Sequence, residues 1–157
     1  MSDMHLMAGH LIRRLNQISM SIFQERIKSA GYDLTSVQYA TLDTLRQHPG
    51  IDQSTLAGLI AYDRATIGGV LDRLENKGLL QREQSAKDRR ARVLNLTPKG
   101  MDLYLQLLPI VNKLQGDILA GLTQEERQHF LELAVKVAKF GNKYSRAPLA
   151  ETSDSNS

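Results

Sequence analysis

Apolar side chains recur at helical spacing through most of this chain, and the pattern changes only between Leu79 and Leu96. In the helical stretches the apolar residues recur at i, i+3 and i+4, which places them on one face of a helix. Leu79–Gln84 and Ala91–Leu96 instead have strand character, and the polar, basic residues 85–90 separate them. We therefore predict a mainly α protein with a small β-hairpin: four helices, the hairpin with a charged tip, and two further helices.

Capping residues set the bounds of the predicted helices. A Thr or Asp able to accept a backbone N–H stands before each helix after the first, and Thr35 and Thr123 form capping boxes with the Gln or Glu three residues later. Proline follows Thr97 at the first helical position, and Pro109 should kink the same helix. The predicted helices cover about residues 6–29, 35–47, 52–60, 63–77, 98–118 and 123–144.

The third and fourth predicted helices are joined by about three residues, which is the spacing of a helix-turn-helix, and the hairpin follows them as a wing. The first helix and the last two are long and apolar, and a small winged lobe cannot cover them. We therefore expect these helices to bury each other across a two-fold homodimer. The predicted fold is a winged helix-turn-helix with long N- and C-terminal dimerisation helices.

This pattern predicts one domain over residues 1–145. Within it, the winged lobe covers about 34–97, and the dimerisation helices cover about 5–30 and 98–145. The remaining residues, 146–157, are rich in Ser, Asp, Asn and Glu and have almost nothing to bury. We predict that this tail is disordered.

Positive charge is concentrated in the hairpin. Residues 82–99 hold six basic and two acidic side chains, a local net charge of +4, whereas the whole chain has +3. Such a cluster suits a polyanion, in particular nucleic acid. At the predicted tip, Lys87, Arg89 and Arg90 can enter a DNA minor groove, and Asp88 can brace one of the arginines.

The outward face of the fourth helix combines small side chains with hydrogen-bond donors. If Ile67 and Leu71 face inward, Gly69 and Arg73 face outward, which suits a helix lying in the major groove. The alternative is a solvated face, but each glycine of the Gly68-Gly69 pair would cost about 1 kcal/mol in a helix without function. The predicted DNA contacts are Ser54, Thr55, Arg64, Ala65, Thr66, Gly68, Gly69, Arg73, Lys87, Asp88, Arg89 and Arg90.

Two segments, Asp72–Leu80 and Asp88–Gly100, resemble the end of the recognition helix and the wing of the MarR family of bacterial transcription regulators, and the element order is similar over residues 5–145. In this pattern Asp88 and Arg90 match the Asp-x-Arg of the wing, and residues 63–77 match the recognition helix. The resemblance implies a homodimer, usually a repressor, that binds a pseudo-palindromic double-stranded DNA operator. It also implies release from DNA when a small aromatic or phenolic ligand binds.

One interpretation of the first helix is that it binds an aromatic-acid effector. In addition, Tyr62–Gly69 is similar to recognition helices of family members tied to aromatic-acid catabolism. Arg14 shares a helical stripe with apolar residues and should face the crevice between the first, second and fifth helices. There it either binds a ligand carboxylate or pairs with an internal carboxylate such as Asp43 or Glu25. The candidate ligand contacts are Met7, His10, Leu11, Arg13, Arg14 and Tyr39. A free acid and a bulkier thioester both remain open, as do repression and activation.

Other function classes fit the sequence poorly. The chain has no cysteine, which excludes disulfides, thiolate sensing and cysteine-ligated zinc, and its four histidines are scattered. We expect no metal, no cofactor and, since catalytic motifs such as G-x-S-x-G are missing, no enzyme activity. Without a long apolar run or a signal peptide, the expected location is the cytoplasm, with no membrane partner. A winged adaptor for protein–protein contact alone, without ligand sensing, is the alternative function.

Overall fold

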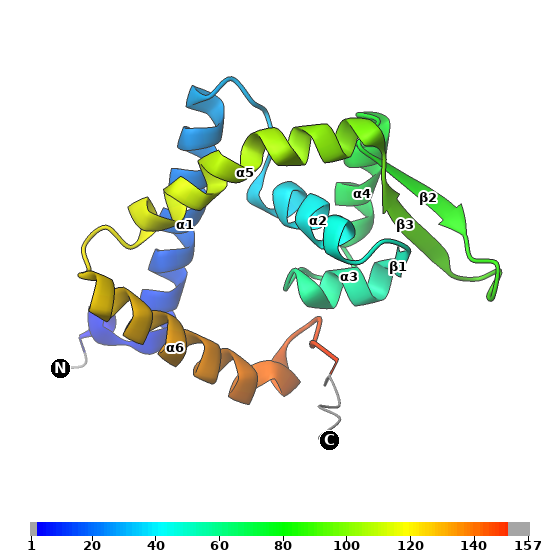
Figure 1. The fold of residues 1–157 in the computed structure, drawn as a ribbon. Helices are drawn as coiled ribbons and strands as arrows, with labels where there is room; N and C mark the ends of the chain where they lie inside the picture. Colours follow the sequence, from blue (N-terminus) through cyan, green and yellow to red (C-terminus); the bar gives the residue numbers. More distant parts are fainter. Residues whose placement is uncertain (1–2, 151–157) are drawn as a thin grey trace, which may run out of the picture.

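The computed structural model describes residues 3–150, and this part of the chain is mainly helical with a small antiparallel sheet (Figure 1). The mainly α winged fold is confirmed. Its helices are α1 (Ala8–Ser29), α2 (Ser36–Gln47), α3 (Gln53–Leu59), α4 (Ile67–Asn76), α5 (Pro98–Ile118) and α6 (Gln124–Gly141). Its strands are β1 (Ile51–Asp52), β2 (Leu80–Gln84) and β3 (Arg92–Leu96), and two short 3-10 helices cover Met4–Leu6 and Asn142–Tyr144. Within residues 3–150, every helix is too short or too polar to cross a membrane.

Most predicted helix starts are confirmed by side-chain caps. The hydroxyl of Thr35 accepts a hydrogen bond from the Gln38 N–H at 3.2 Å, and the side-chain oxygen of Gln38 accepts one from the Thr35 N–H at 3.0 Å, which completes the capping box. Thr123 forms the same arrangement before α6, and Asp52 caps α3 through the Thr55 N–H at 2.8 Å. The long α5 continues through Pro109, and Figure 1 shows it changing direction along its length.

The start of the fourth helix is one turn later than predicted. Asp63 does not cap a helix, because its side chain accepts the N–H of Ala65 at 2.9 Å and its carbonyl accepts those of Thr66 and Ile67. These bonds close a turn over Asp63–Thr66, and this local use of an Asp side chain competes with helix formation. Arg64, Ala65 and Thr66 therefore precede α4 instead of belonging to it.

The wing contains one strand more than the predicted hairpin. Strands β2 and β3 pair antiparallel as predicted, with Gln84 opposite Arg92 at the tip end. Strand β1 adds to the other edge of β3, with Ile51 opposite Leu94, so the strand order is β1-β3-β2. Two residues are too few to show an alternating pattern, which is why β1 was not predicted.

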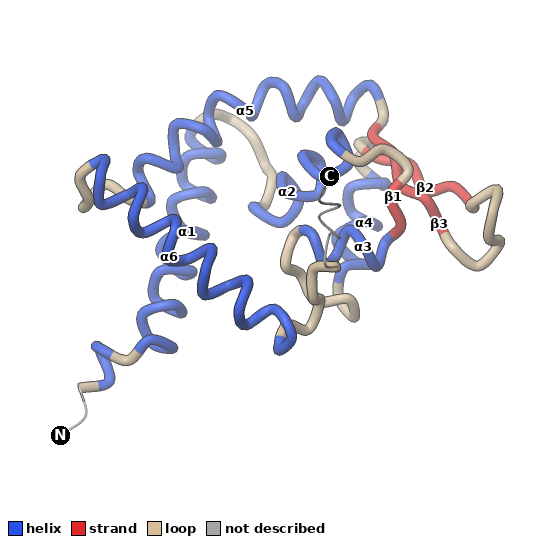
Figure 2. Tube along the Cα trace, turned by 60° about the horizontal axis from the view of Figure 1, so that its bottom comes forward, coloured by secondary structure: helices blue, strands red, loops and turns tan. Residues whose placement is uncertain are grey.

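The apolar core joins the winged lobe to α5 and to one half of α1. The buried side chains include Ile27, Leu42, Leu56, Leu71, Leu74, Leu94, Tyr104 and Leu107. By contrast, the N-terminal half of α1 is exposed, and α6 contributes no buried residue. Phe140 on α6 is 82% exposed. In Figures 1 and 2 the wing projects from one end of the molecule, opposite the N-terminal end of α1.

The described part of the C-terminal tail differs from the prediction of disorder. Residues 145–150 return to the winged lobe, where Ala147 is 3% exposed and belongs to the apolar core. A single small apolar side chain in a polar segment gave no signal of burial. The rest of the predicted tail, 151–157, lies outside the described residues.

Candidate nucleic-acid interface

Helix α4, the predicted recognition helix, buries the predicted side and exposes the other. Ile67, Val70, Leu71 and Leu74 are all buried. Gly69 and Arg73 are exposed on the opposite face, and Gly68 is half-buried beside them. Arg64, Ala65 and Thr66 are exposed in the preceding turn, and Ser54 and Thr55 are exposed on α3. The structure thus places every predicted contact of the helix-turn-helix at the surface or at its edge.

The two glycines of α4 are not explained by packing within the chain. A Cβ built on Gly69 would meet no atom of residues 3–150 within 4 Å, and one built on Gly68 would approach only the Gln53 side chain, at 3.7 Å. Glycine inside a helix costs about 1 kcal/mol relative to alanine, so a stability role alone would favour alanine at Gly69. The open space lies on the exposed face of α4, opposite the buried apolar side chains.

The wing tip is held by local hydrogen bonds that do not involve the charged groups of its cations. The Ser85 N–H donates to the Ala91 carbonyl at 2.9 Å, which closes the ribbon. Asp88 accepts the backbone N–H of Arg90 at 2.9 Å. Asp88 therefore holds one of the predicted arginines, Arg90, but through its backbone N–H and not through its guanidinium. The side chains of Lys87, Arg89 and Arg90 are exposed.

A hollow of about 540 Å³ on the wing is lined by Arg82, Gln84, Arg89, Arg90 and Arg92. Three of these arginines, Arg89, Arg90 and Arg92, are exposed, and guanidinium groups around one polar hollow suit a phosphate or another anion. Arg92 is missing from the predicted contacts, since its position two residues before buried Leu94 places it on the core face of β3. Beyond the edge of the lobe no core covers that face, and Arg92 is exposed there.

Arg82 differs from the other cations because carboxylates of α4 neutralise it. Its guanidinium pairs with Asp72 and with Glu75, the latter at 3.1 Å. The hydrogen bond from Arg82 holds the pKa of the Glu75 carboxyl below its ordinary value, and the same bond raises the pKa of Arg82. These pairs explain why Asp72 lies on the outward face of the helix. They join the wing to α4, which fixes the two candidate DNA-contacting elements relative to each other.

Comparison with known proteins places this arrangement in a family. A sequence profile described as MarR family matches residues 34–91. The transcriptional regulator HosA of Escherichia coli is 33% identical over 130 residues, which cover 83% of this chain and 93% of HosA. The chain belongs to the MarR family. The MarR-family relatives are transcription regulators and not enzymes.

Solved structures of other MarR-family proteins share the fold. BpsR of Bordetella bronchiseptica has a TM-score of 0.81 at 30% identity, over 88% of this chain and 97% of that chain, and its structure concerns regulation of DNA binding by 6-hydroxynicotinic acid. A variant of Escherichia coli MarR in complex with operator DNA has a TM-score of 0.77 at 26% identity, over 87% of this chain and 99% of that chain. This MarR-family chain is therefore similar to proteins that bind operator DNA or respond to a small molecule.

The predicted ligand contacts of this MarR-family chain do not meet in one pocket. Arg14 is exposed on α1 and lines an open hollow with His10, Arg13, Asn16, Gln17 and Met20. Tyr39 lies elsewhere, with its ring stacked on that of Tyr104 at 5.7 Å. Leu11 shares the exposed half of α1 with Arg14, and Met7, also exposed, precedes the helix as its N-cap. The expectation that Arg14 faces a crevice beside Tyr39 is wrong for the single chain, because within residues 3–150 the side chains around Arg14 on α1 are exposed.

The internal salt bridge considered for Arg14 is also not formed. Glu25 pairs with Arg26 at 3.0 Å. Asp43 accepts the hydroxyl of Tyr104 at 2.8 Å and lies 3.7 Å from Arg46. Within residues 3–150 Arg14 has no carboxylate within 4.0 Å, so its charge is available to a group from outside this part of the chain.

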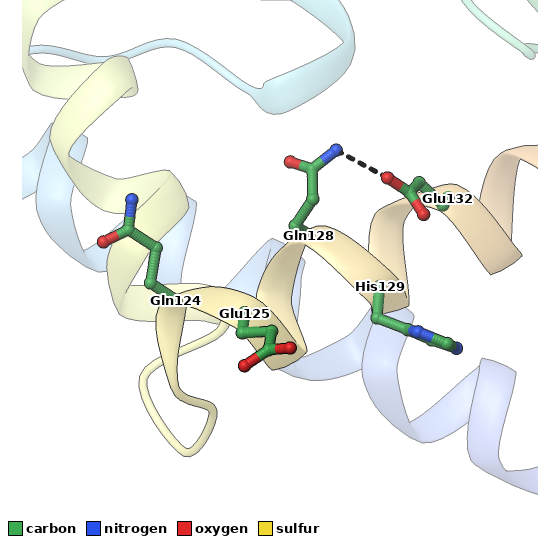
Figure 3. A pocket seen from close by; sticks show the side chains of 5 residues that line it. All are labelled: Gln124, Glu125, Gln128, His129 and Glu132. Carbon is green, nitrogen blue, oxygen red and sulfur yellow. Dashed lines mark hydrogen bonds between the residues drawn. The ribbon is translucent and has the colours of Figure 1, made fainter.

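A further hollow lies on α6 and is lined by Gln124, Glu125, Gln128, His129 and Glu132. Figure 3 shows that these side chains spread along the helix, with a hydrogen bond of 3.0 Å from Gln128 to Glu132. No group of three or more His, Cys, Asp or Glu side chains suited to a metal ion occurs among the described residues. This surface therefore offers no converging set of groups for a ligand.

Proposed function

We propose that this MarR-family regulator reads double-stranded DNA with α4 in the major groove and the wing tip in the adjacent minor groove. The observation that carries the proposal is the open space over Gly69, which no side chain of residues 3–150 fills. A helix with small residues on its outward face approaches base edges closely, while Arg64, Thr66 and Arg73 supply donors to bases and phosphates. The arginines of the wing hollow add attraction to the phosphates.

The DNA-binding form in this proposal is a homodimer. The exposed apolar residues of α1 and α6 supply a surface for a second copy, and they include Leu11, Ile18, Leu133 and Val137. Two-fold symmetry places two copies of α4 in successive major grooves, about 34 Å apart along the duplex. The operator is then a pseudo-palindrome with half-sites about one helical turn apart.

We further propose that the protein is a repressor released from its operator by a small aromatic acid or its conjugate. The support is Arg14, which has no carboxylate partner within residues 3–150 and lies in one hollow with His10 and Arg13, and the likeness to BpsR, whose DNA binding is regulated by 6-hydroxynicotinic acid. A guanidinium binds a carboxylate through paired hydrogen bonds. Release requires that the acid bind the form that is wrongly spaced for DNA more tightly than the DNA-bound form.

The adaptor alternative is not favoured, because contact with proteins alone requires neither an open glycine face on α4 nor a hollow lined by arginines. Both features are present on adjoining elements, and the Arg82 pairs hold these elements together. A protein that only contacts other proteins would gain stability from alanine at Gly69.

In vitro selection from random double-stranded DNA tests the proposed function. We expect the wild-type chain to enrich duplexes with two related half-sites, bound by a dimer whose mass light scattering measures. Arg90→Ala should bind the selected duplex more weakly, whereas Lys28→Ala, which removes a cation far from the wing, should bind like the wild type. Enrichment of no duplex, or binding by a monomer, would contradict the proposal.

Binding of the effector has a separate test. Aromatic acids such as 6-hydroxynicotinic acid and benzoic acid, and aromatic thioesters, are screened by thermal denaturation, because a ligand stabilises the folded state that it binds. We expect a stabilising acid or thioester to lower the affinity for the selected duplex. A compound that stabilises the protein without changing this affinity is not an effector.

A further inference from the structure

The segment Ser145–Ala150, here called the C-terminal strap, is anchored against the winged lobe. Ala147 is buried in the same apolar core as the helices of the lobe. The next residue, Pro148, brings its carbonyl to α3, where a Cβ built on Gly58 would lie 3.0 Å from the oxygen. The absence of a side chain at Gly58 therefore makes space for the strap, and a larger residue at this position would press against the backbone of the strap.

Asn142 ties the strap to the end of α6. Its side-chain amide donates to the Leu149 carbonyl at 2.9 Å, and its side-chain oxygen accepts the Leu149 N–H at 2.9 Å. Within the strap, the hydroxyl of Ser145 accepts the Ala147 N–H at 3.1 Å. Six residues thus connect the end of α6 to α3 through defined hydrogen bonds and one buried side chain.

The strap also contacts the turn that leads into α4. The guanidinium of Arg146 lies 3.3 Å from one carboxylate oxygen of Asp63, and the other oxygen accepts the Ala65 N–H. Strap residues Pro148–Ala150 line a hollow of about 500 Å³ together with Ser54, Thr55 and Arg64. All three of these lobe residues are proposed DNA contacts, so the strap borders the DNA-contacting surface.

We propose that Arg146 and Ala147 are positioning residues for DNA recognition, because the docked strap holds the turn before α4 at a set place relative to α6. This inference rests on the proposed DNA-binding function. The half-buried Asp63 carboxylate precedes Arg64 in the turn, where its charge would repel phosphates, and Arg146 offsets this charge. Helix α6 carries part of the proposed dimer surface. The docked strap therefore links the position of α4 to that of the dimer surface within the same chain.

Two variants undock the strap by different routes. Ala147→Gln introduces a long polar side chain at a buried position, and Asn142→Ala removes both hydrogen bonds to Leu149. Ala30→Gln, the matched control, introduces the same glutamine in place of an exposed alanine that follows α1. None of these changes alters the net charge. Hydrogen exchange at the Leu149 amide reports whether the strap is docked, and anisotropy with the duplex selected by the wild type reports binding.

We expect the Leu149 amide to exchange faster in both variants and affinity for the selected duplex to fall by at least about tenfold, which is about 1.4 kcal/mol. Affinity for an unrelated duplex and the salt dependence should not change, because the strap variants keep every phosphate-binding cation. A merely structural role would instead weaken binding to both duplexes. Ala30→Gln should behave like the wild type in every measurement.

Faster exchange with wild-type affinity for the selected duplex would overturn the inference. Unchanged exchange in both variants would overturn it as well, because the described anchors would then not hold the strap. If Ala147→Gln does not fold, Asn142→Ala carries the same test, since its change is confined to one half-buried amide. A wild-type chain that selects no duplex contradicts the proposed function itself, which is a separate outcome.

Discussion

Glu75 of α4 accepts three hydrogen bonds from Arg82 of β2, from its backbone N–H at 3.2 Å and from its guanidinium at 3.3 and 3.1 Å. The guanidinium also pairs with Asp72, one turn earlier on the helix. Helix α4 and the wing are thus held together by one largely buried cation. Although Arg82 is basic, its main role is to hold α4 and the wing in place, because the two carboxylates offset its charge.

Arg82→Ala should destabilise the fold by about 1–3 kcal/mol, because two carboxylates lose their partner and one of them is half-buried. Urea denaturation measures this loss. Arg92→Ala removes an exposed cation of the same hollow and should leave stability within about 0.5 kcal/mol of the wild type. Equal denaturation midpoints for the two variants would show that the pair does not hold the wing.

The Glu75 pair should also give stability a dependence on acid pH. Its folded-state pKa lies below the ordinary 4.5, with the hydrogen bond from Arg82 as the main cause. The stabilisation is therefore complete above pH 4.5 and is lost as pH falls through the folded-state pKa. Glu75→Gln should flatten this part of the stability profile. Urea denaturation between about pH 3 and 6, the range in which carboxyl groups titrate, measures the difference.

Gly100→Ala should be among the most damaging small changes in the chain. A Cβ at Gly100 would lie 2.0 Å from the Leu79 carbonyl oxygen, which belongs to backbone and cannot rotate away. We expect a loss of about 3 kcal/mol or more in thermal or urea denaturation. Gly9→Ala is the matched control, because its Cβ would meet no described atom, and it should leave stability unchanged or raised by up to about 1 kcal/mol.

Gly69→Leu should separate folding from DNA binding. The open space over Gly69 accepts the side chain, so the melting temperature should stay the same or rise. In the DNA complex the same side chain would occupy the groove, and affinity for the selected duplex should fall by at least about tenfold. Anisotropy and thermal denaturation on one preparation check both parts. Wild-type affinity would place the DNA away from this face of α4.

Arg90→Ala should weaken DNA binding by about 1–3 kcal/mol and reduce the slope of log affinity against log salt by about one. The side chain is exposed, while Asp88 holds only the backbone of Arg90, so the shape of the tip should survive the substitution. Titrations at several salt concentrations measure both quantities. An unchanged slope would remove Arg90 from the phosphate contacts.

Arg14→Ala should leave affinity for the selected duplex intact and blunt release by an aromatic acid. The charge of Arg14 has no carboxylate partner in the described chain, so its removal should cost little stability. Release is followed by anisotropy as the acid is added. A variant that is released at the same acid concentration as the wild type would show that Arg14 does not bind the effector.

Local rules explain what could be predicted of the fold. Thr35, Asp52 and Thr123 cap their helices as expected, because each cap depends on residues within one turn of chain. Strand β1 could not be predicted, since its only signal is a pairing with β3 that is far away in sequence. Asp63 shows a different limit: an Asp before an apolar stretch can cap a helix or close a turn, and the two have the same local sequence.

The candidate DNA interface was largely predictable because its residues lie close together in sequence. Gly69 and Arg73 follow from the helical period once Leu71 faces inward, and the cations of the tip follow from one charged loop. The strap was not predictable, because its anchor Ala147 lies against Gly58 of α3, which is far away in sequence. The crevice expected beside Arg14 depends on which helix covers α1. The spacing of apolar residues along the chain does not specify that helix.

Helix α6 is an 18-residue arm with no buried side chain. In proteins most of the stability of a helix comes from packing of its apolar face, so the arm depends on the surface that covers it. If that surface is a second copy, dilution should melt the arm before the lobe, and the active fraction should rise with protein concentration. The amount synthesised by the cell would then determine how much of the protein is competent to regulate.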